Sequence, residues 1–233
     1  MPVGIPKVPF LIPGDEEETW VDLYNRLHRE RCLFLGQKMD FEITNTILGL
    51  LVFLSKEDKN REHSLLINCP GGWVFCGIAL FDMIRFVPPH VNTIGAGKAY
   101  SMGSLVLTGG EISQRVALPH AKVLVHQPTS SYLGDTLGEL YTDGDEFQSL
   151  RDTVIRLYRQ RTGQPEWVIV RDLERDSFMT PTEAKIHGII DLVALPGEWE
   201  FPLFKKLPDS YEPETWEGIL YNDTNRSQNS WNC

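Results

Sequence analysis

The chain has 233 residues and a net charge of −10 at pH 7, and it is 42% hydrophobic and 23% charged. This length fits one domain with an appendage, and such a domain buries about 70% of the surface of its unfolded chain. The acidic balance argues against nucleic acid as a partner, which would require a clustered basic face, and it disfavours an anionic membrane surface. We therefore expect neither nucleic acid nor a membrane among its partners.

The cysteines and the apolar runs narrow the class of protein further. No two of the four cysteines have the C-x-x-C spacing, so we expect no zinc site, no other metal and no disulfide framework. Cys69 and Cys76 lie in apolar contexts that are typical of reduced core thiols. No secretory signal is visible, and the most apolar run, residues 47–54, is too short to span a bilayer. These features predict a soluble protein of a reducing compartment, without a cofactor.

The first fifth of the chain is predicted to form an arm followed by two helices. Four prolines within the first fourteen residues prevent a regular helix there, so residues 1–19 are expected to form the arm. Acidic residues at 16–18 and arginines towards residue 31 suit the dipole of a helix that starts at Glu16 and ends near Arg31. A short strand at 33–36 and a helix from Asp40 or Glu42 to Ser55 follow.

The middle of the chain alternates between apolar strands and helices. The strands are predicted at 65–68, 92–95, 115–118 and 122–126, and the helices at 74–86 and 101–109. This alternation argues for βαβ units with right-handed crossovers, in which active residues lie at the carboxyl ends of the strands.

The last third is predicted to hold one long helix, one short helix and a tail. A loop from residue 134 leads into a helix that ends near Arg161, interrupted at 142–146 by an acidic segment typical of a solvated turn. A short helix is expected at 181–187. The periodic pattern ends at Pro196, so residues 196–233 are expected to form a tail without its own core. The aromatic residues of the tail predict that part of it lies on a neighbouring surface.

The segment around Ser101 carries the strongest chemical signal. Ala99-x-Ser101-x-Gly103 is close to the nucleophile-elbow pattern, in which a serine on a tight strand-to-helix turn presents its hydroxyl. His126, at the end of a later strand, can supply the base that a weak hydroxyl nucleophile requires. The glycine pair at 71–72 lets backbone N–H groups point into a cavity, as an oxyanion hole requires. Each motif alone is also compatible with a structural turn.

A carboxylate that orients the histidine would complete a triad, and the segment 172–180 offers two. Either Asp172 or Asp176 could orient a histidine and stabilise its imidazolium, and the spacing does not choose between them. By charge pattern alone, the segment is typical of a solvated turn of mixed sign.

Together the motifs resemble those of the ClpP family, the self-compartmentalised serine protease subunits of the Clp machinery. In order, they are Ile67-Asn68-Cys69-Pro70-Gly71-Gly72, Ala99-Tyr100-Ser101-Met102-Gly103, His126-Gln127-Pro128, and Glu174-Arg175-Asp176 with Glu183-Ala184 and Gly188-Ile189-Ile190-Asp191. The resemblance covers residues 20–195, and residues 1–9 look most like the plastid-encoded members. It implies an α/β fold, the crotonase-like spiral of βαβ units with a protruding handle helix, and a place in the chloroplast stroma.

The resemblance implies roles for single residues. Ser101 matches the nucleophile, His126 the general base and acid, and Asp176 the carboxylate that orients His126. The backbone N–H groups of Gly72 and Met102 match the oxyanion hole.

Other implied features concern assembly. Arg175 matches the arginine that links the triad geometry to contact between rings. The implied partners are other Clp protease subunits in stacked heptameric rings, an AAA+ Clp ATPase that threads unfolded polypeptide substrates, and those substrates themselves. The family's groove for the hydrophobic loop of the ATPase keeps Phe86, but Ser64, Leu66 and Val116 stand where aromatics are usual. Because aromatic rings supply much of the buried anchor area, we expect this subunit to dock the ATPase weakly.

Two departures from the family pattern lie beside the expected site. Tyr100 replaces the usual small residue before the nucleophile, and Cys69 replaces the usual serine before Pro70.

The expected function is a serine endopeptidase subunit of an ATP-dependent Clp protease. One alternative is a catalytically idle structural subunit of a mixed ring. Another is a crotonase-type acyl-CoA enzyme, whose chemistry has no need of a Ser101–His126 pair.

Overall fold

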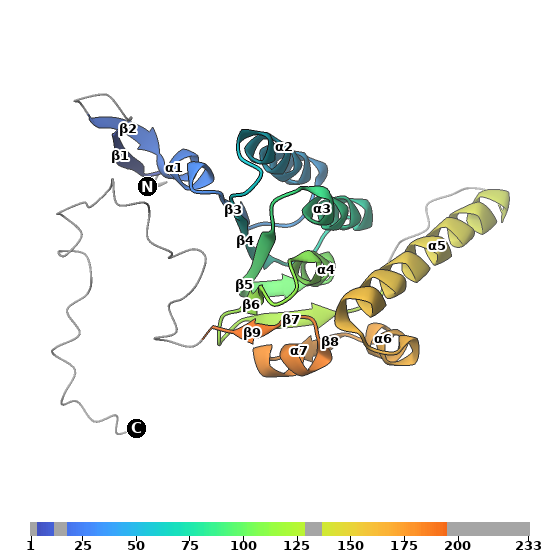
Figure 1. The fold of residues 1–233 in the computed structure, drawn as a ribbon. Coiled ribbons are helices and arrows are strands. Elements are labelled where there is room, and N and C mark those ends of the chain that lie inside the picture. The colour runs from blue at the N-terminus through green and yellow to red at the C-terminus, as the bar shows by residue number, and fades with distance from the viewer. Residues whose placement is uncertain (1–3, 12–17, 129–136, 195–233) are drawn as a thin grey trace, which may run out of the picture. The chain divides into compact units, whose positions relative to one another are not determined.

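The computed structural model describes residues 4–11, 18–128 and 137–194 (Figure 1). Its helices are α1 (Leu23–Arg29), α2 (Phe41–Glu57), α3 (Val74–Phe86), α4 (Met102–Gly109), α5 (Leu137–Thr162), α6 (Glu166–Leu173) and α7 (Pro181–His187). Its strands are β1 (Lys7–Leu11), β2 (Glu18–Asp22), β3 (Cys32–Leu35), β4 (His63–Cys69), β5 (Val91–Tyr100), β6 (Arg115–Ala117), β7 (Lys122–Val125), β8 (Ser177–Met179) and β9 (Leu192–Val193). The tail expected at 196–233 lies outside the described residues.

The core of the fold is one sheet of mostly parallel strands. Strands β3, β4, β5, β6 and β9 follow one another in that order, all parallel. Strand β7 is parallel to the last part of β5, while β6 pairs with an earlier part, and β8 is antiparallel to β7. Helices α2, α3 and α4 lie side by side along the sheet (Figure 1). The predicted α/β class with βαβ units is confirmed.

The N-terminal segment differs from the prediction. Residues 18–22 form strand β2, which pairs antiparallel with β1, so the first helix begins at Leu23 rather than at Glu16. The guanidinium groups of Arg26 and Arg29 lie 5.2 and 4.7 Å from the centre of the Phe10 ring on β1. The acidic residues suit a helix start by local preference, but pairing with a strand of the arm overrides that preference.

The helices of the central part agree closely with the periodicity of their apolar residues. Helix α3 has the predicted bounds, and α2 begins after Asp40, whose side chain accepts a hydrogen bond from the Ile43 N–H at 3.0 Å. This contact satisfies one of the free donors at the helix start. The predicted apolar side of α2 faces the core through Ile47, Leu51 and Leu54.

The acidic segment 142–146 is part of α5 and not a turn, which corrects the prediction. Asp143, Asp145 and Glu146 are exposed there. An exposed turn of helix needs no apolar stripe, so the acidic run is compatible with a helix that continues through it. The later part of α5 packs against α4 and α6, and its buried residues are Val154, Ile155, Leu157, Tyr158 and Arg161.

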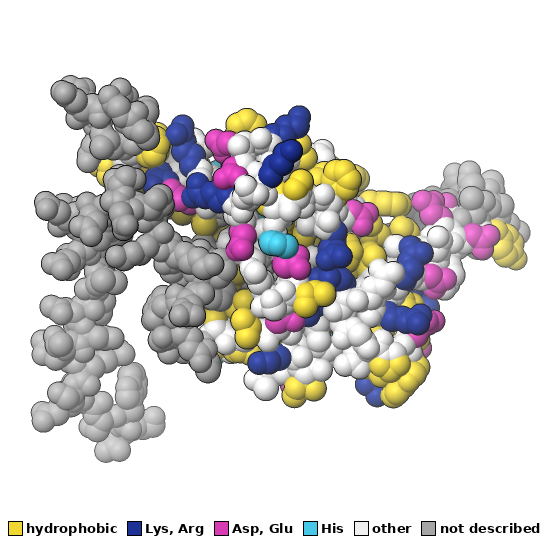
Figure 2. Space-filling model, viewed as in Figure 1, with side chains coloured by type: hydrophobic (Ala, Val, Ile, Leu, Met, Phe, Trp, Pro, Cys, Tyr) yellow, Lys and Arg dark blue, Asp and Glu magenta, His cyan; other side chains and the backbone are white. Residues whose placement is uncertain are grey.

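The described surface carries charges of both signs. Figure 2 shows Lys and Arg side chains interspersed with Asp and Glu over the visible face.

Cys69 and Cys76 are buried free thiols, as predicted, and Cys32 is a third. Burial raises the pKa of the Cys69 thiol, so it remains protonated and unreactive at neutral pH.

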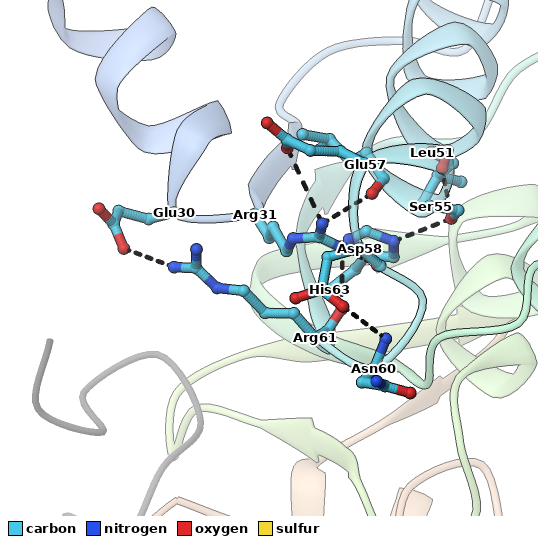
Figure 3. Close-up of polar contacts among 10 residues, drawn as sticks. Glu30, Arg31, Leu51, Ser55, Glu57, Asp58, Asn60, Arg61 and His63 are labelled. Carbon is cyan, nitrogen blue, oxygen red and sulfur yellow. Dashed lines mark hydrogen bonds and ion pairs between the residues drawn. The ribbon is translucent and has the colours of Figure 1, made fainter. Parts of the chain in front are cut away.

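A buried arginine closes the end of α2 (Figure 3). The guanidinium of Arg31 donates to the carbonyl oxygens of Leu54, Asp58 and Arg61 at 2.7 to 2.9 Å, and only 2% of its side chain is exposed. Leu54 lies in the last turn of α2, where the helix leaves carbonyl groups short of partners, whereas Asp58 is its C-cap and Arg61 lies in the loop that follows. Arg31 therefore joins the start of β3 to the end of α2 and the loop that leads to β4.

His63 lies beside this arginine and is fully buried. Its Nε2 is 3.1 Å from Ser55 Oγ, and Ser55 donates its own proton to Leu51 O at 2.6 Å. His63 Nε2 must therefore carry the proton of a neutral ring. Burial, reinforced by the charge of Arg31, lowers the pKa of His63 to about 4.

This pKa predicts a loss of stability in mild acid. Below pH 6.5 His63 gains a proton in the unfolded chain, whereas in the folded chain the His63 ring stays neutral down to about pH 4. The free energy of unfolding should therefore fall by roughly 1 kcal/mol per pH unit across this window because of this residue. The free energy of unfolding can be measured with urea at several pH values between 7 and 4.5. Plotted against pH, it should fall less steeply for His63→Phe than for the parent chain. His90→Phe is the matched control, because His90 is exposed, and its dependence on pH should match that of the parent chain. An unchanged dependence of the free energy of unfolding on pH in His63→Phe would contradict the prediction.

Candidate active site

The site residues are placed by the register of four adjacent strands. Cys69 of β4 is paired with Ala99 of β5, Ala99 with Val123 of β7, and Val123 with Met179 of β8. Because β4, β5 and β7 are parallel, the residues that follow them meet at one edge of the sheet. These are the glycine pair 71–72, Ser101 and His126, and the antiparallel β8 brings the residue that precedes it, Asp176, to the same edge.

Ser101 sits in a strained turn between β5 and α4. Its backbone angles are φ +54° and ψ −123°, a conformation that costs a non-glycine residue on the order of 1–3 kcal/mol. The Ser101 N–H donates to Leu124 O at 2.9 Å, which fixes the turn to the neighbouring strand β7. Such strain is typical of a serine whose hydroxyl is presented at a nucleophile elbow. The predicted strand-to-helix placement of Ser101 is confirmed.

His126 and Asp176 face one another across the β7–β8 pair. Val125 pairs with Ser177, and the same register continued by one residue puts His126 opposite Asp176. His126 Nδ1 is 3.6 Å from Asp176 Oδ1, and 26% of the histidine side chain is exposed. The backbone of the next residue, Gln127, donates to Leu173 O at 2.7 Å, which holds the end of β7 against the end of α6. At 3.6 Å the contact is an ion-pair distance rather than a hydrogen bond, and it makes Asp176 the carboxylate that faces the His126 ring.

The second aspartate that the sequence offered has a different partner. Asp172 Oδ2 is 2.9 Å from His187 Nε2, and Asp172 Oδ1 accepts from Arg171 Nε at 2.9 Å. This pair ties the end of α6 to the end of α7. The structure thus brings Asp176, and not Asp172, to His126.

The glycine pair forms a loop over Ser101, held by Met39. A Cβ added to Gly71 would lie 2.8 Å from Ser101 Cβ, and one added to Gly72 would lie 2.1 Å from Met39 O. Met39 N donates to Gly71 O at 2.9 Å, and Trp73 N donates to Met39 O at 3.2 Å. Both glycines are therefore required by close approach of the backbone. The sequence singled out Gly72, whereas the glycine that touches Ser101 is Gly71, and the role of Met39 had no sequence signal.

The expected oxyanion donors lie on either side of this turn. Gly72 N–H and Met102 N–H make no hydrogen bond to another group within the described ranges. Met102 is the first residue of α4, where backbone N–H groups are free of partners in the helix and carry the positive end of the dipole. Both N–H groups are thus free to bind an anionic oxygen.

The two unusual residues beside the site are accommodated by packing. The Tyr100 ring packs edge-on against Phe178 of β8, with ring centres 5.8 Å apart. Cys69 is fully buried, and its Sγ accepts the Gly71 N–H at 3.3 Å. A Cβ added to Gly103 would lie 3.1 Å from Cys69 O, so Cys69 supports the glycine loop and the start of α4 together.

The other predicted site residues are not part of the triad, although Arg175 directly precedes Asp176. Arg175 is exposed between α6 and β8. Leu66 is half-buried on β4 opposite Phe34 of β3, and Phe86, at the end of α3, is 82% exposed. Phe34 in turn packs edge-on against Tyr24 of α1 at 5.7 Å, an aromatic pair beside Leu66 that the sequence analysis missed.

The described residues contain no group of three or more His, Cys, Asp or Glu side chains that could hold a metal ion. None of the helices in these ranges is long and apolar enough to cross a membrane.

A strained serine at the end of a strand, a glycine loop against it and a His–Asp pair beside it are typical of serine hydrolases. The model of the Clp protease family matches residues 15–196. An ATP-dependent Clp protease proteolytic subunit from Platanus occidentalis is 56% identical over 201 residues, which cover 86% of this chain and 100% of that relative. Relatives of the same name from Drimys granadensis and Acorus calamus are 56% and 57% identical, over 86% and 83% of this chain and 100% and 96% of theirs. The chain therefore belongs to the Clp protease family, a family of serine peptidases.

Proposed function

We propose that Ser101, His126 and Asp176 form the catalytic triad of a serine endopeptidase subunit that cleaves unfolded polypeptides. The observation that carries the proposal is the meeting of a strained Ser101 with the His126–Asp176 pair at one edge of the sheet. Membership of a serine peptidase family supports the same reaction.

The mechanism follows from the geometry. Ser101 Oγ attacks the carbonyl carbon of the peptide bond while His126 accepts its proton, and Asp176 stabilises the imidazolium that forms. The N–H groups of Gly72 and Met102 stabilise the negative oxygen of the tetrahedral intermediate. His126 then protonates the leaving amine, the C–N bond breaks, and water activated by His126 releases the acyl group from Ser101.

The test is fluorophosphonate labelling of the native assembled particle. The probe reacts only with an activated serine, so this chain should be labelled and the Ser101→Ala variant should not. Absence of label on this chain, while neighbouring subunits of the same particle react, would overturn the proposal.

That second result would favour a structural, catalytically idle subunit. One observation points this way, because no hydrogen bond joins Ser101 Oγ to His126 among the residues described. Catalytic hydrogen bonds are often long in enzymes without substrate and tighten in the complex, so the geometry of the free chain is compatible with activity.

The proposal extends to partners and location. The chain has no Gly-x-x-x-x-Gly-Lys-[Ser/Thr] loop, so ATP must be hydrolysed by another protein. We propose that this is an AAA+ Clp ATPase, and that the chain joins other Clp subunits in stacked heptameric rings, with Arg175 sensing the ring contact. The relatives are proteolytic subunits of an ATP-dependent protease from plants, which supports these partners and a place in the chloroplast stroma.

We also propose that this subunit contributes little to ATPase docking. Phe86 is exposed, as a docking aromatic must be, but Leu66 offers only a half-buried aliphatic side chain. Each lost aromatic anchor weakens such a contact by on the order of 1 kcal/mol or more. Photo-crosslinking from the hydrophobic loop of the ATPase should therefore label neighbouring subunits more than this one. Preferential crosslinks to Leu66 and Phe86 would contradict the prediction.

A further inference from the structure

A buried pair of hydroxyl groups lies beneath the turn that carries Ser101. Ser104 Oγ, from α4, is 2.6 Å from Tyr158 Oη, from α5. Ser104 is fully buried, and Tyr158 is only 3% exposed. Burial also raises the pKa of the Tyr158 phenol, so its hydroxyl keeps its proton and acts as a hydrogen-bond donor. Neither residue belongs to the triad or to the oxyanion hole.

The pair contacts the backbone of the two segments that present Ser101 and His126. Ser104 Oγ is 2.7 Å from Ser101 O and 2.9 Å from Leu124 O, and Tyr158 Oη is 3.4 Å from Ser101 O. Leu124 O also accepts the Ser101 N–H, and Leu124 precedes His126 by two residues on β7. The Ser104 hydroxyl therefore lies at the junction between the turn of the nucleophile and the strand of the base.

The number of protons determines how the hydroxyl groups are connected. Each group has one proton, and Ser104 Oγ can use its proton for only one of its two carbonyl neighbours. Donation from Tyr158 to Ser104 lets Ser104 donate to Ser101 O or Leu124 O at 2.7 or 2.9 Å, whereas the reverse direction leaves the Tyr158 proton only Ser101 O at 3.4 Å. The shorter contacts favour Tyr158 as the donor to Ser104. Removing the Tyr158 hydroxyl leaves Ser104 Oγ short of a donor in a site without water access, where an unpaired polar atom is costly. The orientation of Ser104 thus depends on Tyr158.

We propose that Ser104 and Tyr158 are positioning residues that hold the backbone of Ser101 in its strained conformation. The proposal rests on the proposed role of Ser101 as the nucleophile. Tyr158 belongs to the part of α5 that packs on α4. The seating of α5 on α4 therefore sets the geometry of the nucleophile, and a shift of about 1 Å there is enough to slow attack strongly.

The test uses the assembled particle and variants that keep the packing. Tyr158→Phe removes one hydroxyl and keeps the ring, and Ser104→Ala removes the other. Each should lower the rate constant of fluorophosphonate labelling about tenfold, the effect of one lost hydrogen bond on the barrier, and should lower kcat for a peptide with little change in KM. The double variant should be no slower than either single variant, because both changes break one chain of bonds.

Thr108→Val is the matched control. Thr108 is buried on the same helix, and its hydroxyl donates to Leu105 O and does not touch Ser101. Its labelling rate should equal that of the parent chain. Labelling of Tyr158→Phe and Ser104→Ala at the control rate would overturn the proposal.

A second measurement separates this proposal from the assignment of the nucleophile. Hydrogen exchange at the Ser101 amide, which is bonded to Leu124 O, should be faster in Tyr158→Phe than in Thr108→Val. If the parent chain is not labelled but exchange at the Ser101 amide is faster in Tyr158→Phe than in Thr108→Val, the positioning role stands and the role of Ser101 as nucleophile fails. If the exchange is the same in both variants, the positioning role fails, whether or not Ser101 is labelled.

Discussion

Replacing Asp176 with asparagine is expected to lower the acylation rate of Ser101 by about 10⁴-fold in the assembled particle. The asparagine side chain can hold the His126 ring by its carbonyl or amide, but it supplies no charge to stabilise the imidazolium and it favours the wrong tautomer. The fold should be unaffected, because 68% of the Asp176 side chain is exposed and its ion pair is with His126. Fluorophosphonate labelling rates measure the effect directly.

Asp172, near the end of α6, offers a matched control for this experiment. Asp172→Asn removes the same charge four residues earlier, but it breaks the pair with His187 at 2.9 Å and leaves His126 untouched. We expect an unchanged labelling rate and a chain that unfolds more easily, since 16% or less of each side chain is exposed. A loss of acylation in Asp172→Asn, with Asp176→Asn still active, would reverse the assignment.

Replacing Gly72 with alanine is expected to cost both activity and stability. The added Cβ would lie 2.1 Å from Met39 O and 2.7 Å from Met39 Cβ, so the backbone of one segment must move. Displacing the loop removes an oxyanion donor from its place, which is expected to slow acylation by about 10²- to 10³-fold. The strain is expected to lower the free energy of unfolding by a few kcal/mol.

Gly49→Ala is the control for the second prediction. Gly49 lies on α2 with no atom within 4 Å of an added Cβ, so alanine should leave acylation unchanged and stabilise the helix by up to about 1 kcal/mol. Labelling rates and urea unfolding of the two variants, measured side by side, distinguish crowding at Gly72 from a general effect of alanine. Normal labelling of Gly72→Ala would show that its N–H is not needed in the oxyanion hole.

Local pattern predicted the elements that bury one regular face. Helix α3 was predicted with its exact bounds, and the apolar side of α2 is the side that faces the core. These predictions succeed because the spacing of apolar residues within a segment determines which side of its helix is buried. Apart from the exposed segment 142–146 of α5, the errors lie where contact with a distant segment determines the structure. Residues 18–22 became a strand because β1 pairs with them, and strand β8 and helix α6 were not predicted at all.

Sequence patterns alone were enough to predict the class of the fold and the residue types of the site, because the serine, histidine and glycine motifs are short and each lies after its own strand. Their spacing left Asp172 and Asp176 open and the family resemblance implied Asp176, but the contact with His126 itself depends on the antiparallel register of β7 with β8. Tertiary packing alone placed Gly71 and Met39 against the loop, and Tyr158 beneath Ser101. Contacts between segments far apart in sequence follow from strand pairing and helix packing, and no local pattern of residues encodes them.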